Sequence, residues 1–532
     1  MMRLHGYRKD FLAPRSLLAF AVALSCCVAS AKEPPPSERA ATEGFAVARV
    51  ANNGDAPYLR LVVERDGGRN YTLETKTPVV PNPAMYGAWL PPGEYRLLRL
   101  DSSWFGFYQL PASVDLEGMF PKFSVEAGKL TDLGTLLQQP VGPLRATVVQ
   151  MSDADGEGPL VRAHYPEIAA ALAADPIRWN GTSNWAYRDA SVSTGGGLLV
   201  SIIDRAITKA NQPSMKDQWP KATSAREIVE LGKRATVAMT PPVFDGGGNA
   251  FFGSALGQVL VRSPQGQWSN RDTGVADEVD AVFFEDGRLY AGTTEGRLLL
   301  STDRGATWST GARAPGIVTG IARLGSDFVV AVAGTPDTQA LLLRGPNFLE
   351  LPSVPWKVLG TARPQQRHPL RSVGLDVFGE RLVAWAVPEQ WFVYDAGSNA
   401  WKESAAPSAD ARFVNAAAGL IYSGGFRKGA LSIDRGATWR ELRFQGMGVG
   451  VGFRDATNGV AVVAPNRPVV VENFAVSTKD GGNTWTEVWT IPGACRSAFY
   501  LPPSDDLICM LKDGNILGSG HGADWTVERV VY

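Results

Sequence analysis

A repeated octapeptide in the second half of the chain limits the possible folds more than any other feature. Residues 301–308 read Ser-Thr-Asp-Arg-Gly-Ala-Thr-Trp, and residues 432–439 read Ser-Ile-Asp-Arg-Gly-Ala-Thr-Trp. A third version spans residues 477–485 and is one residue longer. Repetition of this kind indicates a modular fold in which each unit buries its apolar surface against its neighbours.

The aromatic residue that ends the octapeptide also marks weaker copies. In chain order these marks are residues 268, 308, 348, 401, 439, 485 and 525, with steps of 40, 40, 53, 38, 46 and 40 residues. Each unit also contains short apolar runs separated by Gly- and Asp-containing turns, which is typical of strands in hairpins. Because a four-stranded propeller blade has this length, the seven marks predict a seven-bladed β-propeller over residues 236–532.

The octapeptide resembles the Asp box, or BNR repeat, of sialidases, sortilin-type receptors and photosystem II assembly propellers. In these families the box lies on the hairpin between the third and fourth strands of a blade, away from the ligand site. The residue types suit a structural role, since an Asp side chain accepts hydrogen bonds from its own turn and Gly tolerates positive φ. The resemblance therefore implies structural roles for Ser301, Asp303, Gly305, Trp308, Ser432, Asp434, Gly436, Trp439, Ser477, Asp480, Gly482 and Trp485.

The first half of the chain has a different pattern. Residues 32–43 are rich in Pro, Ser and Glu and are predicted to be a linker. Residues 44–140 alternate apolar and polar side chains, which predicts a β-sandwich of about seven strands. Residues 141–235 contain helical spacing at 169–174, 198–210 and 225–234, the last after Thr223-Ser224 as a cap. We expect a small helical connector there, within a mainly β protein.

The first 31 residues have the layout of an export signal. A basic start is followed by an apolar run at residues 17–28 and by Ala29-Ser30-Ala31, a small-residue cleavage pattern. The run is too short to cross a bilayer, and no later segment is apolar enough to do so. We expect a periplasmic or secreted mature protein with no integral membrane segment. A lipoprotein signal that ends at Cys26 or Cys27 is the alternative.

Two cysteines remain after signal cleavage, Cys495 and Cys509. They flank a predicted hairpin turn at residues 502–506, which would place them on neighbouring strands. Disulfides are stable in an exported protein, so we favour a disulfide between them over two free thiols.

Charge and composition exclude several function classes. The 52 Lys and Arg nearly balance the 53 Asp and Glu, which argues against nucleic-acid binding through the overall field. Only four His and four Cys are present, and the octapeptide lacks the ligand spacing and closing Glu of an EF-hand. We therefore expect no metal, no cofactor and no nucleic-acid partner.

The propeller face opposite the boxes is the predicted binding surface. It is built from the loops between strands two and three of each blade and from the crossings between blades. A basic rim with an aromatic side chain would suit an anionic glycan or an acidic protein through charge-assisted hydrogen bonds. The alternative is that exposed loops simply carry solvated charges. The candidate ligand-binding residues are Glu295, Arg313, Arg363, Arg367, Glu389, Trp391, Arg427 and Arg467.

These patterns favour an exported, non-catalytic propeller that binds or assembles a protein or glycan partner in the bacterial envelope. The alternative is a sialidase-like glycoside hydrolase of the BNR-propeller kind. That family has three arginines, a Tyr–Glu pair, an acidic Asp and an Arg-Ile-Pro motif before its first box, and this tripeptide is absent here. Glycosidases in general need two facing carboxylates about 5–10 Å apart, for which Glu295 and Glu389 are candidates. Catalytic residues are otherwise left unassigned.

Overall fold

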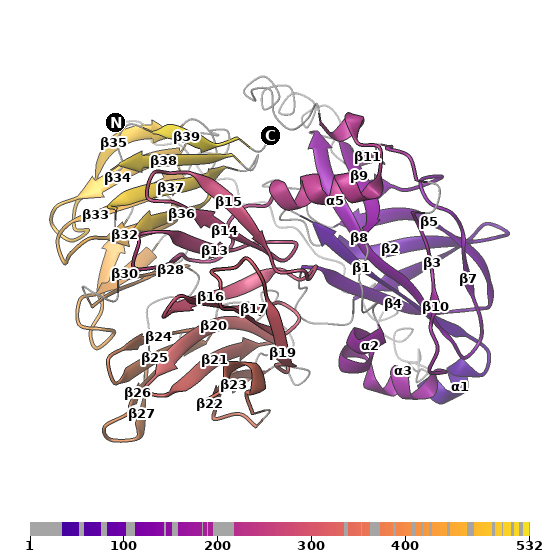
Figure 1. Ribbon diagram of the computed structural model, residues 1–532, viewed down its shortest axis with the longest axis horizontal. Helices are drawn as coiled ribbons and strands as arrows, with labels where there is room; N and C mark the ends of the chain where they lie inside the picture. The colour runs from indigo at the N-terminus through magenta and orange to yellow at the C-terminus, as the bar shows by residue number, and fades with distance from the viewer. Residues whose placement is uncertain are drawn as a thin grey trace, which may run out of the picture.

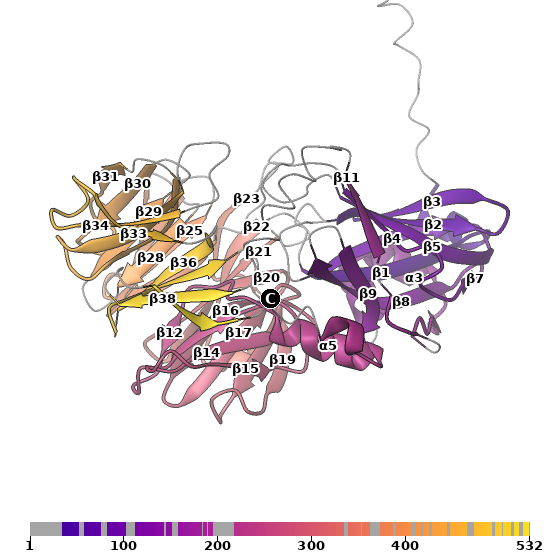
Figure 2. The ribbon, with the colours of Figure 1, turned by 90° about the horizontal axis from the view of Figure 1, so that it is seen from above.

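The computed structural model divides the chain into an N-terminal sheet domain and a C-terminal propeller, seen side by side in Figure 1 and Figure 2. None of the helices in the described part of the chain is long and apolar enough to cross a membrane. The structure describes residues 34–530 apart from residues 53–57, 76–81, 103–111, 143–144, 152–157, 183–184, 189, 195–217, 335–338, 353, 362–372, 387–389, 406–410, 416–418, 425–427, 444–446, 465–472, 492–494, 503, 512–514 and 521–524.

Seven four-stranded antiparallel sheets, each built from consecutive strands, confirm the seven-bladed propeller. Every aromatic mark lies at the connection into the fourth strand of its blade or on that strand, as Trp308 before β19 illustrates. Blade 1 is β12 (Val243–Phe244), β13 (Ala250–Gly253), β14 (Gln258–Arg262) and β15 (Trp268–Asp272); blade 2 is β16 (Val279–Glu285), β17 (Arg288–Thr293), β18 (Arg297–Ser301) and β19 (Ser309–Arg313); blade 3 is β20 (Ile317–Leu324), β21 (Asp327–Ala333), β22 (Gln339–Gly345) and β23 (Lys357–Thr361), with the 3-10 helix η4 (Phe348–Glu350) before β23.

The remaining four blades have the same strand order. Blade 4 is β24 (Gly374–Phe378), β25 (Arg381–Ala386), β26 (Gln390–Asp395) and β27 (Ala400–Ala405); blade 5 is β28 (Ala411–Asn415), β29 (Leu420–Gly424), β30 (Lys428–Ser432) and β31 (Arg440–Arg443); blade 6 is β32 (Met447–Phe453), β33 (Gly459–Ala464), β34 (Asn473–Thr478) and β35 (Thr486–Ile491); blade 7 is β36 (Cys495–Leu501), β37 (Asp506–Leu511), β38 (Ile516–Gly520) and β39 (Thr526–Arg529).

The octapeptides lie on the hairpins between the third and fourth strands and make their own hydrogen-bond network. The Ser301 hydroxyl donates to Asp303 Oδ1 (2.7 Å) and accepts from the Gly305 N–H (2.6 Å). Asp303 accepts from both the N–H (2.8 Å) and the hydroxyl (2.6 Å) of Thr307. The indole of Trp308 donates to the Gly305 carbonyl (3.1 Å), so a short stretch of sequence fixes the turn locally.

The third octapeptide corrects one assigned residue, because Thr478 and not Ser477 occupies its first position. The Thr478 hydroxyl donates to Asp480 Oδ1 (2.8 Å) and accepts from the Gly482 N–H (2.8 Å). This is the geometry of Ser301 and Ser432, at the same spacing of two residues before the Asp. The third copy therefore has eight positions, with no extra residue, because Thr supplies the same hydroxyl as Ser.

Replacing Thr478 with valine is expected to lower the free energy of unfolding by about 1–3 kcal/mol. Valine keeps the shape of threonine but leaves the buried Gly482 N–H without its acceptor. The Ser477→Ala variant should change stability by less than about 0.5 kcal/mol. Urea unfolding of both variants tests this register, and equal losses would contradict it.

The box carboxylates should also make the propeller sensitive to acid. Hydrogen bonds from the Thr307 hydroxyl and N–H lower the pKa of Asp303 to about 2, and Thr484 does the same for Asp480. A pKa below the unfolded value of about 3.9 stabilises the fold above pH 4, and this contribution is lost as the pH falls toward 2. A D303N/D480N variant should therefore lose less stability than the parent between pH 5 and pH 2. Asp286→Asn, in an exposed turn, is the control, and identical pH slopes for parent and double variant would contradict the assignment.

A disulfide joins Cys495 on β36 to Cys509 on β37, with their Cα atoms 5.6 Å apart. The two strands are hydrogen-bonded neighbours on either side of the turn near Pro502. This turn is the one that the sequence argument used to place the two cysteines on neighbouring strands.

In the described part of the chain, side chains close the ring between blade 1 and blade 7, because the strands of each blade pair only among themselves. Arg262 on β14 donates to Glu528 on β39 through Nε (2.8 Å) and Nη2 (2.6 Å), and it also pairs with Asp506 (3.0 Å). The Trp268 indole donates to the same Glu528 carboxylate (2.8 Å). Burial acts to lower the pKa of Arg262, but its bonds to Glu528 outweigh this and raise it. A small, largely buried ionic cluster thus closes the ring together with an apolar core, in which Phe252 of blade 1 packs against Phe499 and Ile508 of blade 7.

The N-terminal domain is one curled mixed sheet, where the sequence had suggested the two sheets of a sandwich. Its path runs β1-β4-β3-β2-β5-β6-β11-β9-β8-β10, and β1 also pairs with β8 in parallel, so the sheet turns back on itself. Three of these strands, β9, β10 and β11, come from the region assigned to a helical connector. The strands are β1 (Gly44–Asn52), β2 (Tyr58–Arg65), β3 (Arg69–Glu74), β4 (Ala84–Leu90), β5 (Gly93–Ser102), β6 (Ala112–Asp115), β7 (Phe123–Val125), β8 (Leu130–Gly142), β9 (Arg145–Met151), β10 (Ile177–Arg178) and β11 (Ala190–Thr194).

Apolar side chains fill the inside of this curled sheet and also its outer faces. Tyr86, Tyr95 and Leu136 belong to the inner core. On one outer side, Phe45 and Trp89 pack against the short helices α1 (Pro36–Ala40), α2 (Gly158–His164) and α3 (Pro166–Ala171). Residues 36–40, which composition assigned to a linker, therefore form a helix that packs on the domain.

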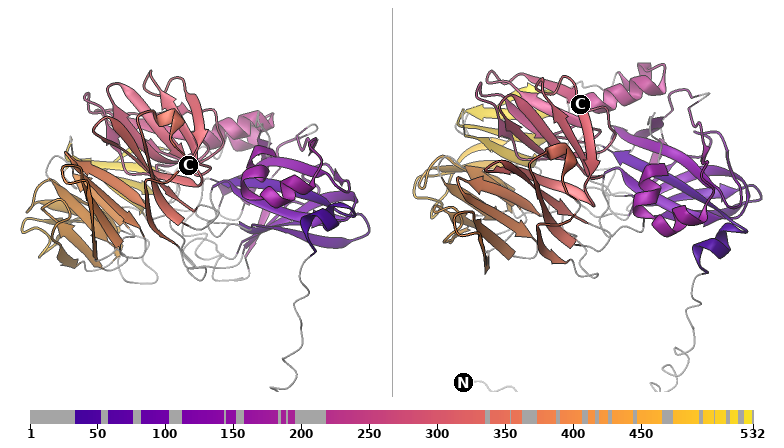
Figure 3. Two further views of the ribbon diagram at one scale, coloured as in Figure 1. Left: turned by 90° about the horizontal axis from the view of Figure 1, so that it is seen from below. Right: turned by 60° about the horizontal axis from the view of Figure 1, so that its bottom comes forward.

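A second outer cluster connects the sheet domain to blade 1. Helix α5 (Ala225–Arg234), with the 3-10 helix η3 (Trp219–Lys221) before it, begins after Ser224, whose hydroxyl accepts from the Glu227 N–H as predicted for a cap. Its Leu231 packs with Leu137 of β8 and with Leu256 in the β13–β14 loop. Figure 3 shows α5 lying between the two domains. The helix predicted at residues 198–210 and the signal peptide fall outside the described residues.

Candidate functional site

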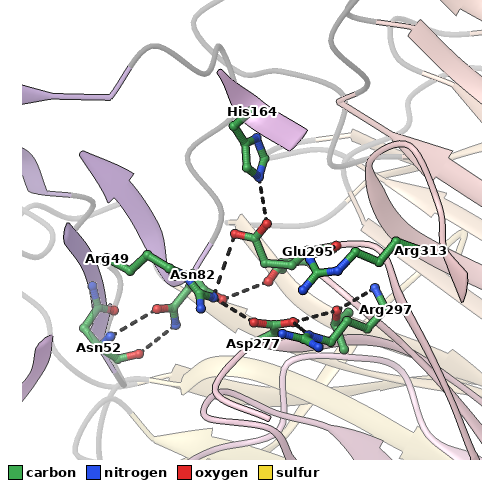
Figure 4. Close-up of polar contacts among 10 residues, drawn as sticks. Arg49, Asn52, Asn82, His164, Asp277, Glu295, Arg297 and Arg313 are labelled. Carbon is green, nitrogen blue, oxygen red and sulfur yellow. Dashed lines mark hydrogen bonds and ion pairs between the residues drawn. The ribbon is translucent and has the colours of Figure 1, made fainter. Parts of the chain in front are cut away.

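A buried polar cluster lies where the sheet domain meets the loop between strands two and three of blade 2 (Figure 4). The propeller contributes Asp277, just before β16, and Glu295, between β17 and β18. The sheet domain contributes Arg49 from β1 and His164 from the end of α2. We call this set of residues, together with Asn82 and Arg297, the interdomain cluster.

Arg49 is the central cation of the interdomain cluster. It lies on β1, whose residues are all buried, and its side chain is 0% exposed. Its Nη2 is 2.7 Å from Asp277 Oδ1 and 3.8 Å from Glu295 Oε1. One guanidinium of the sheet domain thus neutralises two carboxylates of the propeller.

Asp277 is held ionised by its surroundings. Its Oδ2 accepts from Arg297 Nε (2.9 Å) and from the Thr293 hydroxyl (3.2 Å). Burial acts to raise the pKa of Asp277, but the charges of Arg49 and Arg297 outweigh burial and lower it. A carboxyl group with a lowered pKa is a poor general acid near neutral pH.

Glu295 connects the cluster to its solvent side. Its Oε2 is 2.8 Å from His164 Nε2, while its backbone carbonyl accepts from Arg313 Nη1 (3.2 Å). The Glu295 side chain is 1% exposed, whereas the His164 side chain is 27% exposed. The histidine therefore closes the cluster at its rim.

Asn82 joins the two domains through amide hydrogen bonds. Its side chain accepts from the Asn52 N–H (3.1 Å) and donates to the Asn52 carbonyl (2.7 Å) at the end of β1. Its own carbonyl accepts from the Glu278 N–H (3.0 Å) and from the Thr294 hydroxyl (2.9 Å) of the propeller. The blade 2 loop thus finds its hydrogen-bond partners in the sheet domain.

This chemistry suits docking between two protein surfaces. Both carboxylates face arginine or histidine partners, and the described residues contain no group of three or more His, Cys, Asp or Glu arranged to hold a metal. The lowered pKa of Asp277 keeps it as the anion, which is the form that pairs with Arg49 and Arg297.

The structure places three of the eight predicted ligand-binding residues. Glu295 is buried in the interdomain cluster, and Arg313 is exposed beside it. Trp391, expected on an exposed rim, is instead buried, with its ring 5.4 Å from Trp385 and 4.6 Å from Trp439, because it points into the contact between blades 4 and 5. Arg363, Arg367, Glu389, Arg427 and Arg467 lie outside the described residues, so their assignment stays a prediction.

Sequence reasoning missed the cluster's other members. Arg49 and Asp277 are 228 residues apart, and His164 and Glu295 are 131 residues apart. His164 is not among the candidate residues, since nothing nearby in sequence indicates a partner for it. A lone Arg in an otherwise apolar strand, such as Arg49 in β1, is the signal that could have pointed to a buried ion pair.

Comparisons with known proteins assign no family to the chain and give distant structural similarities. No family model matches the chain, and no curated protein matches it. Among solved structures, YCF48 from Cyanidioschyzon merolae is similar with 14% identity and a TM-score of 0.38, over 53% of this chain and 94% of that one. A structure of YCF48 bound to D1 peptide has 15% identity and a TM-score of 0.39, over 53% and 91%. The GH74 xyloglucanase from Xanthomonas campestris has 14% identity and a TM-score of 0.42, over 56% and 55%.

Proposed function

We propose that the mature chain is an exported, non-catalytic β-propeller that binds a protein or glycan partner in the bacterial envelope. The partner would bind the face formed by the loops between strands two and three. The sheet domain would serve as a fixed part of the scaffold over blades 1 and 2.

One observation carries this proposal: the face in question already binds a protein surface within the same chain. At blade 2, Arg49 and Asn82 of the sheet domain satisfy the charges and hydrogen bonds of the loop. At blade 1, Leu256 packs beneath α5. A face that recognises one surface through paired charges and apolar contacts has the chemistry to recognise another on its remaining blades.

The ion pairs of this face support the proposed binding role. Asp277 is held as the anion by Arg49 and Arg297, and Glu295 lies against Arg49 and His164, so these two carboxylates hold two protein surfaces together. The glycoside hydrolase alternative depends on Glu389, which lies outside the described residues and is tested below.

Charge reversal on the two sides of the propeller tests the binding surface. The R427E/R467E variant should lose at least tenfold of the affinity for partners captured from envelope extract or on a glycan array, because these arginines belong to the predicted binding loops. The matched control is R288E/R435E, because Arg288 begins β17, Arg435 lies in the second box hairpin, and both are exposed. Equal binding by both variants would overturn the proposed surface.

A separate measurement tests the absence of catalysis. The purified mature protein should give no turnover above background on a panel of fluorogenic glycosides. Turnover that is abolished by Glu389→Gln would overturn the non-catalytic proposal.

A further inference from the structure

Helix α5 ends against the seam between blade 1 and blade 7, where the propeller ring closes. The guanidinium of Arg529, on β39 of blade 7, donates to the Arg234 carbonyl at the end of the helix and to the Thr236 carbonyl just after it (3.3 Å). The last carbonyl groups of a helix have no partner within the helix, and the helix dipole favours a cation beside them. Arg529 therefore caps the C-terminal end of α5 from blade 7.

Blade 1 contacts the same end of the helix through its outer strand, β15. Asn270 accepts from Arg529 Nη2 through Oδ1 (2.9 Å), and its Nδ2 donates to the Lys233 carbonyl (2.8 Å). The ammonium group of Lys233 also lies 2.6 Å from Asp272 Oδ2. The last turn of α5 is thus bonded both to blade 1 and to blade 7.

Arg529 depends on the helix for most of its hydrogen bonds. No carboxylate of the described residues pairs with it, and burial lowers its pKa to about 10. Two of its three hydrogen-bond acceptors are the carbonyls of Arg234 and Thr236, and the third is Asn270. Because a partly buried charge without hydrogen-bond partners is costly, Arg529 favours the arrangement in which α5 lies against the seam.

The buried side of α5 packs on the sheet domain. Ile228 and Leu231 share an apolar cluster with Leu137 of β8 and with Val149 of β9. The backbone of the helix comes so close to β8 at Gly232 that an added Cβ would lie 3.0 Å from Leu137 Cδ2. Figure 1 shows the helix between the sheet domain and blade 1. One helix therefore contacts the sheet domain and both blades of the seam.

We propose that α5 is a clasp that couples docking of the sheet domain to closure of the propeller ring. When the helix lies on β8 and β9, its C-terminal end bonds to Arg529 and Asn270, and blades 1 and 7 stay together. Coupling between two sites is reciprocal, so loosening the helix from the sheet domain weakens the seam, and opening the seam releases the helix. A ligand that draws the sheet domain away from α5 would thereby open the ring between these blades.

Amide hydrogen exchange of the full mature protein tests the clasp from the sheet-domain side. Leu137→Ala removes a contact with α5 without changing the helix or the propeller. Exchange in β38 and β39 should become at least about fivefold faster. Leu136→Ala is the matched control, because both leucines are 0% exposed on the same strand but Leu136 belongs to the inner core of the sheet domain. It should leave exchange in β38 and β39 within about twofold of the parent.

A second pair of variants tests the clasp from the seam and decides the matter if L137A does not fold. Arg529→Met should make exchange in α5 at least about fivefold faster. Its control is Arg440→Met on β31, because Arg440 also donates to a carbonyl of the next blade, that of Ala456 (2.8 Å), at a junction away from α5. Equal effects of L137A and L136A on β39 would overturn the proposal. So would unchanged α5 exchange in R529M.

Discussion

Substitution of Arg49 by methionine is expected to lower the free energy of unfolding by about 3–5 kcal/mol. The guanidinium is fully buried between Asp277 and Glu295, and methionine would leave both buried carboxylates without this counter-charge. The substitution weakens the contact between the two domains, because Arg49 belongs to the sheet domain and both carboxylates belong to the propeller. We therefore expect the chemical unfolding curve to split, with the sheet domain and the propeller unfolding in separate transitions.

A matched arginine separates the charge effect from a general sensitivity to this substitution. Arg39 forms an ion pair with Glu43 at 2.7 Å, but both side chains are 25% exposed and lie one helical turn apart. Arg39→Met should cost no more than about 1 kcal/mol. If R49M and R39M lose the same small amount of stability, the interdomain cluster does not hold the domains together.

Removal of the Glu528 side chain should open the ring at its closing seam. Glu528→Ala is expected to cost about 3–5 kcal/mol, because it leaves the largely buried Arg262 with Asp506 as its remaining carboxylate partner and frees the Trp268 indole. Among the described strands, none is shared across this seam, so blades 1 and 7 should separate first. Limited proteolysis of the variant should then cut in β39 well below the melting temperature.

Glu285 provides the control for the seam. It pairs with Arg323 at 3.7 Å between side chains that are 32% and 30% exposed. Glu285→Ala should therefore change stability by less than about 1 kcal/mol and leave the proteolysis pattern unaltered. Cleavage of both variants at the same sites would show that blade closure does not depend on Glu528.

The sequence argument predicted the propeller correctly because its signal is local. In the first octapeptide, Ser301, Asp303 and Thr307 bond to one another within seven residues, so the pattern and the structure that it forms coincide. The same locality explains why the hairpin position of the box is confirmed. The error in the third copy arose where Ser477 and Thr478 stand side by side, since both carry the required hydroxyl and the hydrogen bonds alone distinguish them.

Long-range pairing explains what the sequence argument missed. Alternation predicts strands but not their partners, so the parallel pairing of β1 with β8, which turns the sheet back on itself, was not foreseen. For the same reason β11 could not be recognised as a sheet strand within a supposed connector. Of the six residues of the interdomain cluster, the sequence argument selected one, Glu295, as a polar loop residue, because its partners Arg49 and His164 are distant in sequence.

The arrangement of every blade from consecutive strands has a consequence for how the chain can be rearranged. Because no described strand is shared between blades, each connection between neighbouring blades is a place where the ring could be cut and the two ends of the propeller joined. A circular permutant opened there would keep every strand pairing of the propeller and exchange one covalent link for another. In strand pairing, the seam between blades 1 and 7 is then equivalent to the other six junctions. It differs from them because no peptide connection crosses it and side chains make the contact.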